Sequence, residues 1–149
     1  MTDPTPTAGA FDGRTHLLPI RVYYEDTDFT GLVYHGSYVK FFERGRSDFL
    51  RMAGIGHAQL LSGETPLAFV LSRLNLTYLK PARIDEALVV RTTYDAIKGP
   101  RLLIDQAITR DGDVLCRAEV EAVVIDLEGR PRRPSPSLVA AVRPWLADA

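Results

Sequence analysis

A series of alternating apolar and polar residues over positions 69–127 is the feature that most constrains the fold of this chain. Alternation with a period of two is typical of strands that bury one face, and here it predicts four consecutive strands. They cover residues 69–80, 88–98, 101–110 and 114–127. Turn signals such as Gly99-Pro100 and Asp111-Gly112 separate them. Because Asp-Gly is a strong cue for a tight hairpin, we expect neighbouring strands to be antiparallel.

One segment in front of these strands has helical periodicity instead. Apolar residues recur at intervals of three and four over positions 37–52, which predicts a helix with one buried face. Gly45 lies in the middle of that face, where a glycine costs about 1 kcal/mol relative to alanine. We therefore expect the helix backbone to approach a neighbour closely at this point. Gly54 and Gly56 are suitable residues to end the helix.

Shorter elements complete the predicted order. β-Branched and aromatic residues predict a first strand over 17–25, and Ser135-Pro136 predicts the start of a short C-terminal helix. Residues 1–15 are predicted to form a flexible tail. Residues 16–149 are predicted to form a single domain, because a chain of 149 residues builds one core more readily than two.

The order of strand, long helix and four further strands favours an α+β fold of the hotdog type. In such a fold a curved antiparallel sheet, here of about five strands, wraps around one long central helix. The edges of the sheet and its other face then need cover, and a symmetric partner is the usual solution. We therefore expect a homodimer or a dimer of dimers, which is a homotetramer.

Charge and hydropathy exclude several classes of function. With 18 basic and 19 acidic residues the net charge is -1, which gives no general attraction to nucleic acid or to anionic membranes. No apolar run is long enough to enter a membrane, and the first ten residues lack the pattern of a signal peptide. The single cysteine, Cys116, fits a reducing compartment. We expect a cytoplasmic protein that binds no nucleic acid and has no membrane insertion.

The segment YEDTDFTGLVYHG at positions 24–36 places three carboxylates, Glu25, Asp26 and Asp28, within four residues. A glycine turn and a His-Gly pair follow, just before the predicted helix. The residue pattern alone is equally compatible with an Asx-type turn at Asp28, before Gly31, and with a reactive carboxylate there. We interpret Glu25 and Asp26 as structural, and we expect a neighbouring carboxylate to raise the pKa of Asp28.

The run RVYYEDTDFTGLVYHGSYVKFFERGRSDFLR at positions 21–51 resembles the signature of the 4-hydroxybenzoyl-CoA thioesterase family. It is most similar to the YbgC-like acyl-CoA thioesterases associated with the Tol-Pal system. LTYLKPARIDE, KGPRLLIDQ and GRPRRPSP extend the resemblance over nearly the whole chain beyond the tail. Thr30 is a departure, since relatives often carry a small residue there, and we expect it to alter the entrance to the site without touching the chemistry.

The resemblance implies an acyl-CoA thioesterase that releases a free acid and coenzyme A without a cofactor, since coenzyme A is part of the substrate. Asp28 would attack the thioester carbon or act as general base for water, and both routes stay open. Backbone amides around His35 and Gly36, at the start of the helix, would form the oxyanion hole. The His35 side chain is a further catalytic candidate, although a lone histidine at a helix start more often caps or packs.

The resemblance also implies contacts to the substrate. Cations at four positions match places where the family contacts the nucleotide end of coenzyme A, because guanidinium and ammonium groups suit phosphates. These are Lys98, Arg101, Arg132 and Arg133. Apart from the resemblance, Tyr34 is a candidate for lining an acyl pocket, together with Tyr38, Phe41 and Phe42, although aromatic residues at helical spacing more often belong to the core. His16 and His57 have no ligand partners at suitable spacing, so we predict no metal site.

Three other functions are alternatives to thioester hydrolysis. A hotdog dehydratase or hydratase would need a His-Phe-Pro-like or Asp-x-Asn-Pro-x-His-like segment, and neither is present. A non-catalytic acyl-thioester sensor would bind such esters without turnover. An adaptor in an envelope or lipid-synthesis complex would associate with acyl carrier protein, which is also an alternative carrier for the acyl group.

Overall fold

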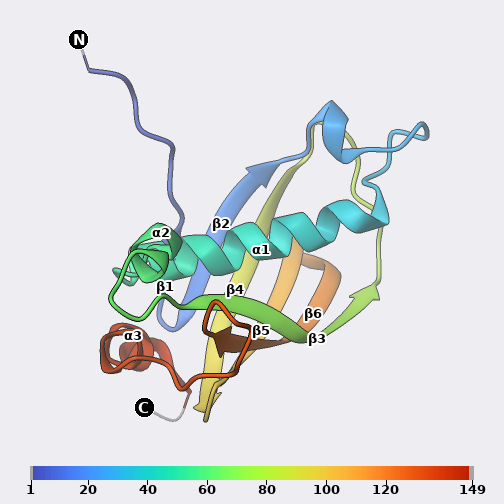
Figure 1. Cartoon of the computed structure of the whole chain (residues 1–149). Helices are drawn as coiled ribbons and strands as arrows, with labels where there is room; N and C mark the ends of the chain where they lie inside the picture. The colour runs from blue at the N-terminus through green and yellow to red at the C-terminus, as the bar shows by residue number, and fades with distance from the viewer. Residues whose placement is uncertain (1, 148–149) are drawn as a thin grey trace.

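A six-stranded antiparallel sheet curves around one long helix in the computed structural model, which describes residues 2–147 (Figure 1). The strands are β1 (Ala10–Asp12), β2 (Thr15–Arg21), β3 (Ala68–Tyr78), β4 (Ala87–Lys98), β5 (Arg101–Arg110) and β6 (Asp113–Ile125). Their order across the sheet is β1-β2-β4-β5-β6-β3, and each neighbouring pair is antiparallel. The predicted hotdog fold is therefore confirmed.

The sixth strand, β1, lies within the segment 1–15 for which the sequence predicts only a tail. It pairs with the start of β2 and places Phe11 against Trp145, with ring centroids 4.3 Å apart. Three residues are too few to show an alternating pattern, and the partner that holds Phe11 is distant in sequence. β1 thus joins the sheet both through a local two-residue turn at Gly13-Arg14 and through long-range packing of Phe11.

The central helix α1 (His35–Met52) begins two residues earlier than predicted and buries the expected face against the sheet. Phe41, Phe42 and Phe49 are fully buried on this face. A Cβ atom at Gly45 would lie 2.6 Å from Val90 Cγ1, which no ordinary packing tolerates. The close approach predicted at this glycine is confirmed, and its partner is β4.

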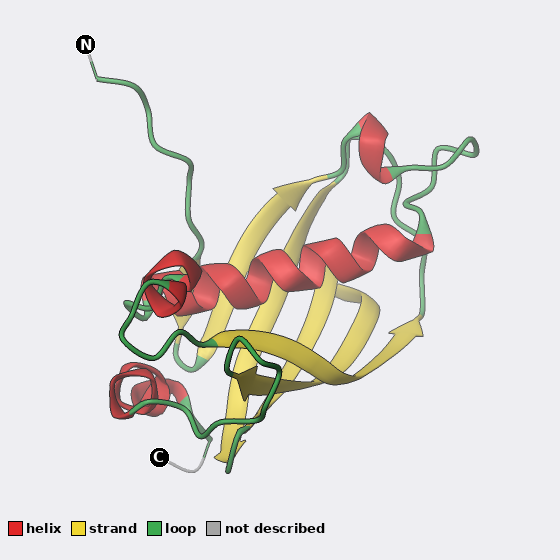
Figure 2. Cartoon of the chain, in the orientation of Figure 1, coloured by secondary structure: helices red, strands yellow, loops and turns green. Residues whose placement is uncertain are grey.

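The remaining helices are short (Figure 2). The 3-10 turn η1 (Tyr24–Asp26) takes the last part of the predicted first strand, so β2 ends at Arg21. Helix α2 (His57–Leu61) was not predicted, because five residues carry too little periodicity. Helix α3 (Pro136–Val142) begins as predicted, with the Ser135 hydroxyl accepting from the backbone of Leu138, and it leads into η2 (Arg143–Trp145). None of the helices within residues 2–147 combines the length and the apolar character needed to cross a bilayer.

A buried histidine links β2 to α1. His16 has no solvent exposure, and its Nε2 lies 2.7 Å from Asp48 Oδ2, which also accepts from the backbone N–H of Gly9. The other ring nitrogen, Nδ1, has no hydrogen-bond partner among the residues described. Burial lowers the pKa of His16 below its ordinary value, while Asp48 acts in the opposite direction with less effect.

The depressed pKa of His16 predicts that acid destabilises the protein. Because the unfolded chain binds the proton more readily, this stability is fully present above the ordinary pKa of 6.5 and is lost as pH falls through the folded value. Urea unfolding at a series of pH values should therefore show a free energy of unfolding that falls from about pH 7 to 5, and His16→Gln should flatten that slope. The exposed His57, changed to Gln, is the control and should keep the wild-type slope. Equal slopes for wild type and His16→Gln would contradict the assignment.

Candidate active site

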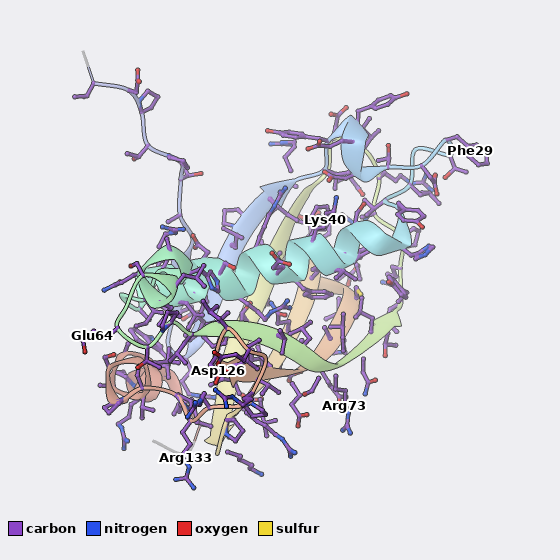
Figure 3. The ribbon with its side chains drawn as sticks, in the orientation of Figure 1. Phe29, Lys40, Glu64, Arg73, Asp126 and Arg133 are labelled. Carbon is purple, nitrogen blue, oxygen red and sulfur yellow. The ribbon has the colours of Figure 1, made fainter. Side chains whose placement is uncertain are left out.

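A tight hairpin over residues 27–33 presents Asp28 between η1 and α1. The backbone N–H of Asp28 donates to Leu32 O at 3.0 Å, and the N–H of Gly31 donates back to Asp28 O at 3.1 Å. Gly31 has a φ of +80°, a conformation that glycine adopts without strain. Phe29 is fully exposed at the tip of this hairpin (Figure 3). The sequence thus folds here into a turn that holds one carboxylate at the surface.

The Asp28 carboxylate is held by its neighbour Thr30. Its Oδ1 accepts from the Thr30 hydroxyl at 2.5 Å and from the Thr30 backbone N–H at 2.8 Å, which is an Asx-type turn. No hydrogen-bond partner of Oδ2 is found among residues 2–147. The Thr30 hydroxyl, followed by its backbone N–H, lowers the pKa of Asp28 below its usual 3.8. The expectation that a neighbouring carboxylate raises this pKa is therefore wrong, and Thr30 touches the carboxylate itself.

Asp26 holds the hairpin to the helix, as its structural interpretation requires. Its buried carboxylate accepts from the backbone N–H of Tyr23 at 2.8 Å. Its carbonyl oxygen accepts from the backbone of Tyr34 and from the Ser37 hydroxyl, both at 2.9 Å. Asp26 therefore fixes where α1 begins relative to Asp28, while Glu25 is exposed.

The first turn of α1 carries two backbone donors that have no partner within residues 2–147. Among the described residues, no acceptor is found for the N–H groups of His35 and Gly36, whereas the N–H of Ser37 donates to Tyr34 O at 2.8 Å. Free donors and the helix dipole make such a terminus suitable for a developing negative charge. The helix start is held in turn by Tyr78, whose hydroxyl donates to His35 O at 2.8 Å.

Tyr34 explains part of the need for glycine at position 36. Its exposed ring lies over His35, with ring centroids 4.2 Å apart, and a Cβ atom at Gly36 would come within 2.8 Å of the Tyr34 ring. Tyr34, His35 and Gly36 therefore form one compact surface that follows the Asp28 hairpin. The structure brings these three predicted residues together.

The four predicted coenzyme A cations lie at the other end of the sheet. Lys98 and Arg101 face each other across the β4–β5 turn, and the backbone of Arg132 pairs with Val124 next to them. The Asp28 hairpin instead adjoins the segment that leads into β4. Strand β4 has 12 residues, which spans roughly 35 to 40 Å. Phe29 and Arg133 mark the two ends in Figure 3, so a single chain does not bring these cations to Asp28.

One of these cations is already engaged in an ion-pair network that the sequence did not reveal. The side chains of Arg132 and Arg130 both donate to Oδ2 of Asp126, at 3.0 and 3.1 Å. The backbone N–H of Arg130, together with these side chains, lowers the pKa of Asp126 to about 2. Asp126 follows β6 and precedes a glycine turn, so only the turn was recognisable from the sequence. Within the described residues Lys98, Arg101 and Arg133 have no carboxylate partner.

A cavity of about 360 Å³ lies away from the Asp28 hairpin, between α1, α2 and β3. Apolar side chains such as Leu50, Leu67 and Ile104 line it, together with the polar side chains of Arg46 and His57. Residues 27–36 do not line it. Sequence reasoning missed this cavity, because α2 has no clear pattern and a single arginine on an apolar helix face gives no signal by itself.

Comparisons with known proteins agree with one another. The family model described as a thioesterase-like superfamily matches residues 22–149. The acyl-CoA thioesterase YbgC of Haemophilus influenzae is 41% identical over 110 residues, which are 74% of this chain and 80% of that protein. The acyl-CoA thioester hydrolase YbgC of Escherichia coli is 40% identical over 124 residues, which are 82% of this chain and 91% of that protein.

The solved structures give the same result. A probable thioesterase from Bartonella henselae superposes with a TM-score of 0.79 at 41% sequence identity. The match covers 81% of this chain and 99% of that one.

Proposed function

The chain belongs to the thioesterase-like superfamily, and from that membership we propose that it hydrolyses an acyl-CoA thioester to the free acid and coenzyme A, with Asp28 as the reacting carboxylate. The observation that carries the assignment is the Asp28 hairpin, which leads directly into the two unpaired amides at the start of α1. Its chemistry is suitable, because Thr30 lowers the pKa of the carboxylate further below its usual 3.8 and binds only Oδ1, which leaves Oδ2 without a hydrogen-bond partner among residues 2–147.

Two routes lead from this carboxylate to the products. In the first, Oδ2 of Asp28 adds to the thioester carbon, the C–S bond breaks to release the coenzyme A thiolate, and water hydrolyses the resulting mixed anhydride. In the second, Asp28 takes a proton from a water molecule that attacks the same carbon, and the C–S bond then breaks to release the coenzyme A thiolate and the free acid. In both routes the N–H groups of His35 and Gly36 donate to the oxygen that gains negative charge, which typically contributes a few kcal/mol to lowering the barrier.

The edge strand β3 supports a homodimer. Its outer side has no neighbouring strand among residues 2–147, and it carries the exposed apolar side chains of Val70, Leu71 and Tyr78. A long edge with unpaired backbone groups and apolar side chains is a template for another strand. We propose that β3 pairs with β3 of a second copy, antiparallel about a two-fold axis.

This pairing would complete the site. The first residues of β3 lie beside the end of β6, near the cations, whereas Tyr78 at its other end contacts the start of α1. A two-fold axis near the middle of β3 would place the start of β3 in one copy beside the end of β3 in the other. The cavity of the second copy and its basic end, with Arg132 and Arg133, would then lie near Asp28 of the first copy. Sedimentation equilibrium should give two or four times the chain mass of 16.5 kDa. A monomer at micromolar concentration would contradict the pairing.

The proposed activity is tested by measuring coenzyme A release from a panel of short, long and aromatic acyl-CoA esters. Hydrolysis of at least one class supports the proposal and identifies that class. Binding of these esters without release of coenzyme A would contradict it and support a non-catalytic sensor. Acyl carrier protein as the carrier, association with the Tol-Pal system, a cytoplasmic location and the lack of a cofactor stay predictions, and pull-down with acyl carrier protein tests the first of them.

The contact between Thr30 and Asp28 predicts a change in the pH profile of this activity. Thr30→Val removes the hydroxyl that has the largest effect on the pKa of Asp28, so that pKa should rise toward its ordinary 3.8. Because the ionised form is the active one, the acidic limb of log kcat/KM against pH should move to higher pH. Thr27→Val is the matched control, since the Thr27 hydroxyl donates to Tyr24 O instead. Superimposable acidic limbs for Thr30→Val and wild type would contradict this role.

A further inference from the structure

The cavity between α1, α2 and β3 combines an apolar floor with a polar wall. Leu50, Leu67 and Ile104 are among the side chains of the floor, while Arg46 and Glu43 project from α1. A volume of about 360 Å³ is within the range of small-molecule sites. Val70 and Leu71 also line the cavity and lie on the exposed edge strand, so its opening is on the side where a second copy would pair.

Arg46 is the unusual member of this lining. It is only 9% exposed, and burial lowers the pKa of its guanidinium. Its Nη1 donates to Oε1 of Gln106 at 3.0 Å, and the Gln106 amide is itself fixed by donating to Phe42 O and Thr92 Oγ1, both at 2.9 Å. Gln106 therefore sets the orientation of the guanidinium group.

The other side-chain donors of Arg46 have no partner within the described part of the chain. No carboxylate within residues 2–147 forms an ion pair with Arg46. In the same range its guanidinium makes one hydrogen bond, from Nη1 to Gln106. Within residues 2–147 the one fully buried side-chain nitrogen or oxygen atom without a hydrogen-bond partner is Nδ1 of His16. The Arg46 nitrogens that have no partner are therefore not fully buried. They are reached from the cavity, which Arg46 lines. A buried cation without an acidic partner is costly unless something else accepts its hydrogen bonds.

We propose that this cavity receives the acyl part of the substrate and that Arg46 donates to an oxygen atom on its distal portion. The substrates are then acyl groups with an apolar body and a hydroxyl or keto oxygen, in preference to plain hydrocarbon chains. The inference rests on the proposed function and on pairing of β3, which bring the cavity of one copy to Asp28 of the other. It makes Arg46 the residue that determines acyl specificity.

The cavity wall favours a neutral oxygen over a carboxylate. Glu43 lines the same cavity one turn before Arg46 and offsets its charge. Ser47 and His57, which also line the cavity, hydrogen-bond to each other, with Ser47 Oγ 3.1 Å from His57 Nε2. A hydroxyl group can accept from Arg46 and donate to Glu43, whereas a carboxylate would be repelled by Glu43.

The kinetic test compares hexanoyl-CoA with hexanoyl-CoA esters that carry a hydroxyl or a keto group at carbons 3 to 6, and with adipoyl-CoA. At least one neutral oxygenated ester should have a kcat/KM about tenfold or more above that of hexanoyl-CoA, in line with a hydrogen bond to a charged group. Arg46→Met should reduce that ratio to about one. A ratio near one in the wild type, or a ratio that Arg46→Met leaves unchanged, would overturn the inference. A preference for adipoyl-CoA would overturn the choice of a neutral oxygen.

A second measurement uses the wild-type protein, because Arg46→Met removes a buried group and can impair folding. The Nε–H resonance of Arg46 in NMR spectra should shift with 6-hydroxyhexanoate, or with the isomer preferred in the kinetic test, more than with hexanoate. Equal shifts, or none, for every acid of the series would overturn the inference. If no acyl-CoA ester is hydrolysed but the resonance responds selectively, the proposed activity fails while the binding chemistry of the cavity stands.

Discussion

Asp28→Asn is expected to reduce kcat/KM for the best acyl-CoA ester by at least about a hundredfold, because the amide can neither add to the thioester carbon nor take a proton from water. The loss should appear in kcat, since the carboxylate acts in the chemical step rather than in binding. Asparagine can still accept from Thr30 through its side-chain oxygen, so the hairpin is expected to keep its conformation. Coenzyme A release under saturating substrate measures the effect.

Glu25 provides the matched control for Asp28. It lies three residues earlier in the same acidic segment and is exposed, so Glu25→Gln removes the same charge without touching the hairpin. We expect its kcat to stay within about threefold of wild type, as for a surface charge outside the reaction. If Asp28→Asn is as active as Glu25→Gln, Asp28 is not the reacting carboxylate.

Phe49→Ala is expected to lower the free energy of unfolding by about 3 to 5 kcal/mol, because it opens a cavity where β1 and η2 pack on α1. The Phe49 ring is fully buried, and it packs against Tyr94 with centroids 4.4 Å apart and against Phe11 at 5.0 Å. It also contacts Trp145 edge to face at 6.0 Å. Urea denaturation followed by circular dichroism measures the loss.

Met52 is the matched control for this core position. It lies one turn later on the same helix but is 39% exposed, so Met52→Ala removes an apolar side chain of comparable length from a site that solvent already reaches. Its cost should be about 1 kcal/mol or less. A similar loss for both variants would mean that the aromatic cluster around Phe49 contributes no more than an ordinary surface contact.

The elements that local pattern determines could be predicted from the sequence. Period-two alternation is strong over the four long strands, and three- and four-residue spacing is strong over α1, so both were recognised. Gly45 was informative because a glycine is unfavourable inside a helix unless a neighbour needs the space, and Val90 occupies that space. The start of α3 was recognisable because capping involves only adjacent residues.

What the sequence did not provide depends mostly on contacts between distant residues. β1 is held in part by packing between Phe11 and Trp145, which no local window contains, whereas its turn to β2 at Gly13-Arg14 is local and was not recognised. The direction of the pKa shift of Asp28 depends on which neighbour its carboxylate meets, and it meets Thr30 rather than another acid. The position of Lys98 and Arg101 relative to Asp28 follows from the sheet register, which separates them by the length of β4.

The central claim is that each site takes Asp28 from one copy and the acyl cavity from the other. The direct test uses two variants, Asp28→Asn and Ser47→Phe, and the second of these fills the cavity with a larger side chain. The two variants are unfolded and then refolded together in equal amounts. Each variant alone should be nearly inactive. Half of the mixed dimers are heterodimers with one intact site out of two, so we predict recovery of about a quarter of the wild-type coenzyme A release. No recovery, with heterodimers present in the mixture, would contradict a site built from two copies.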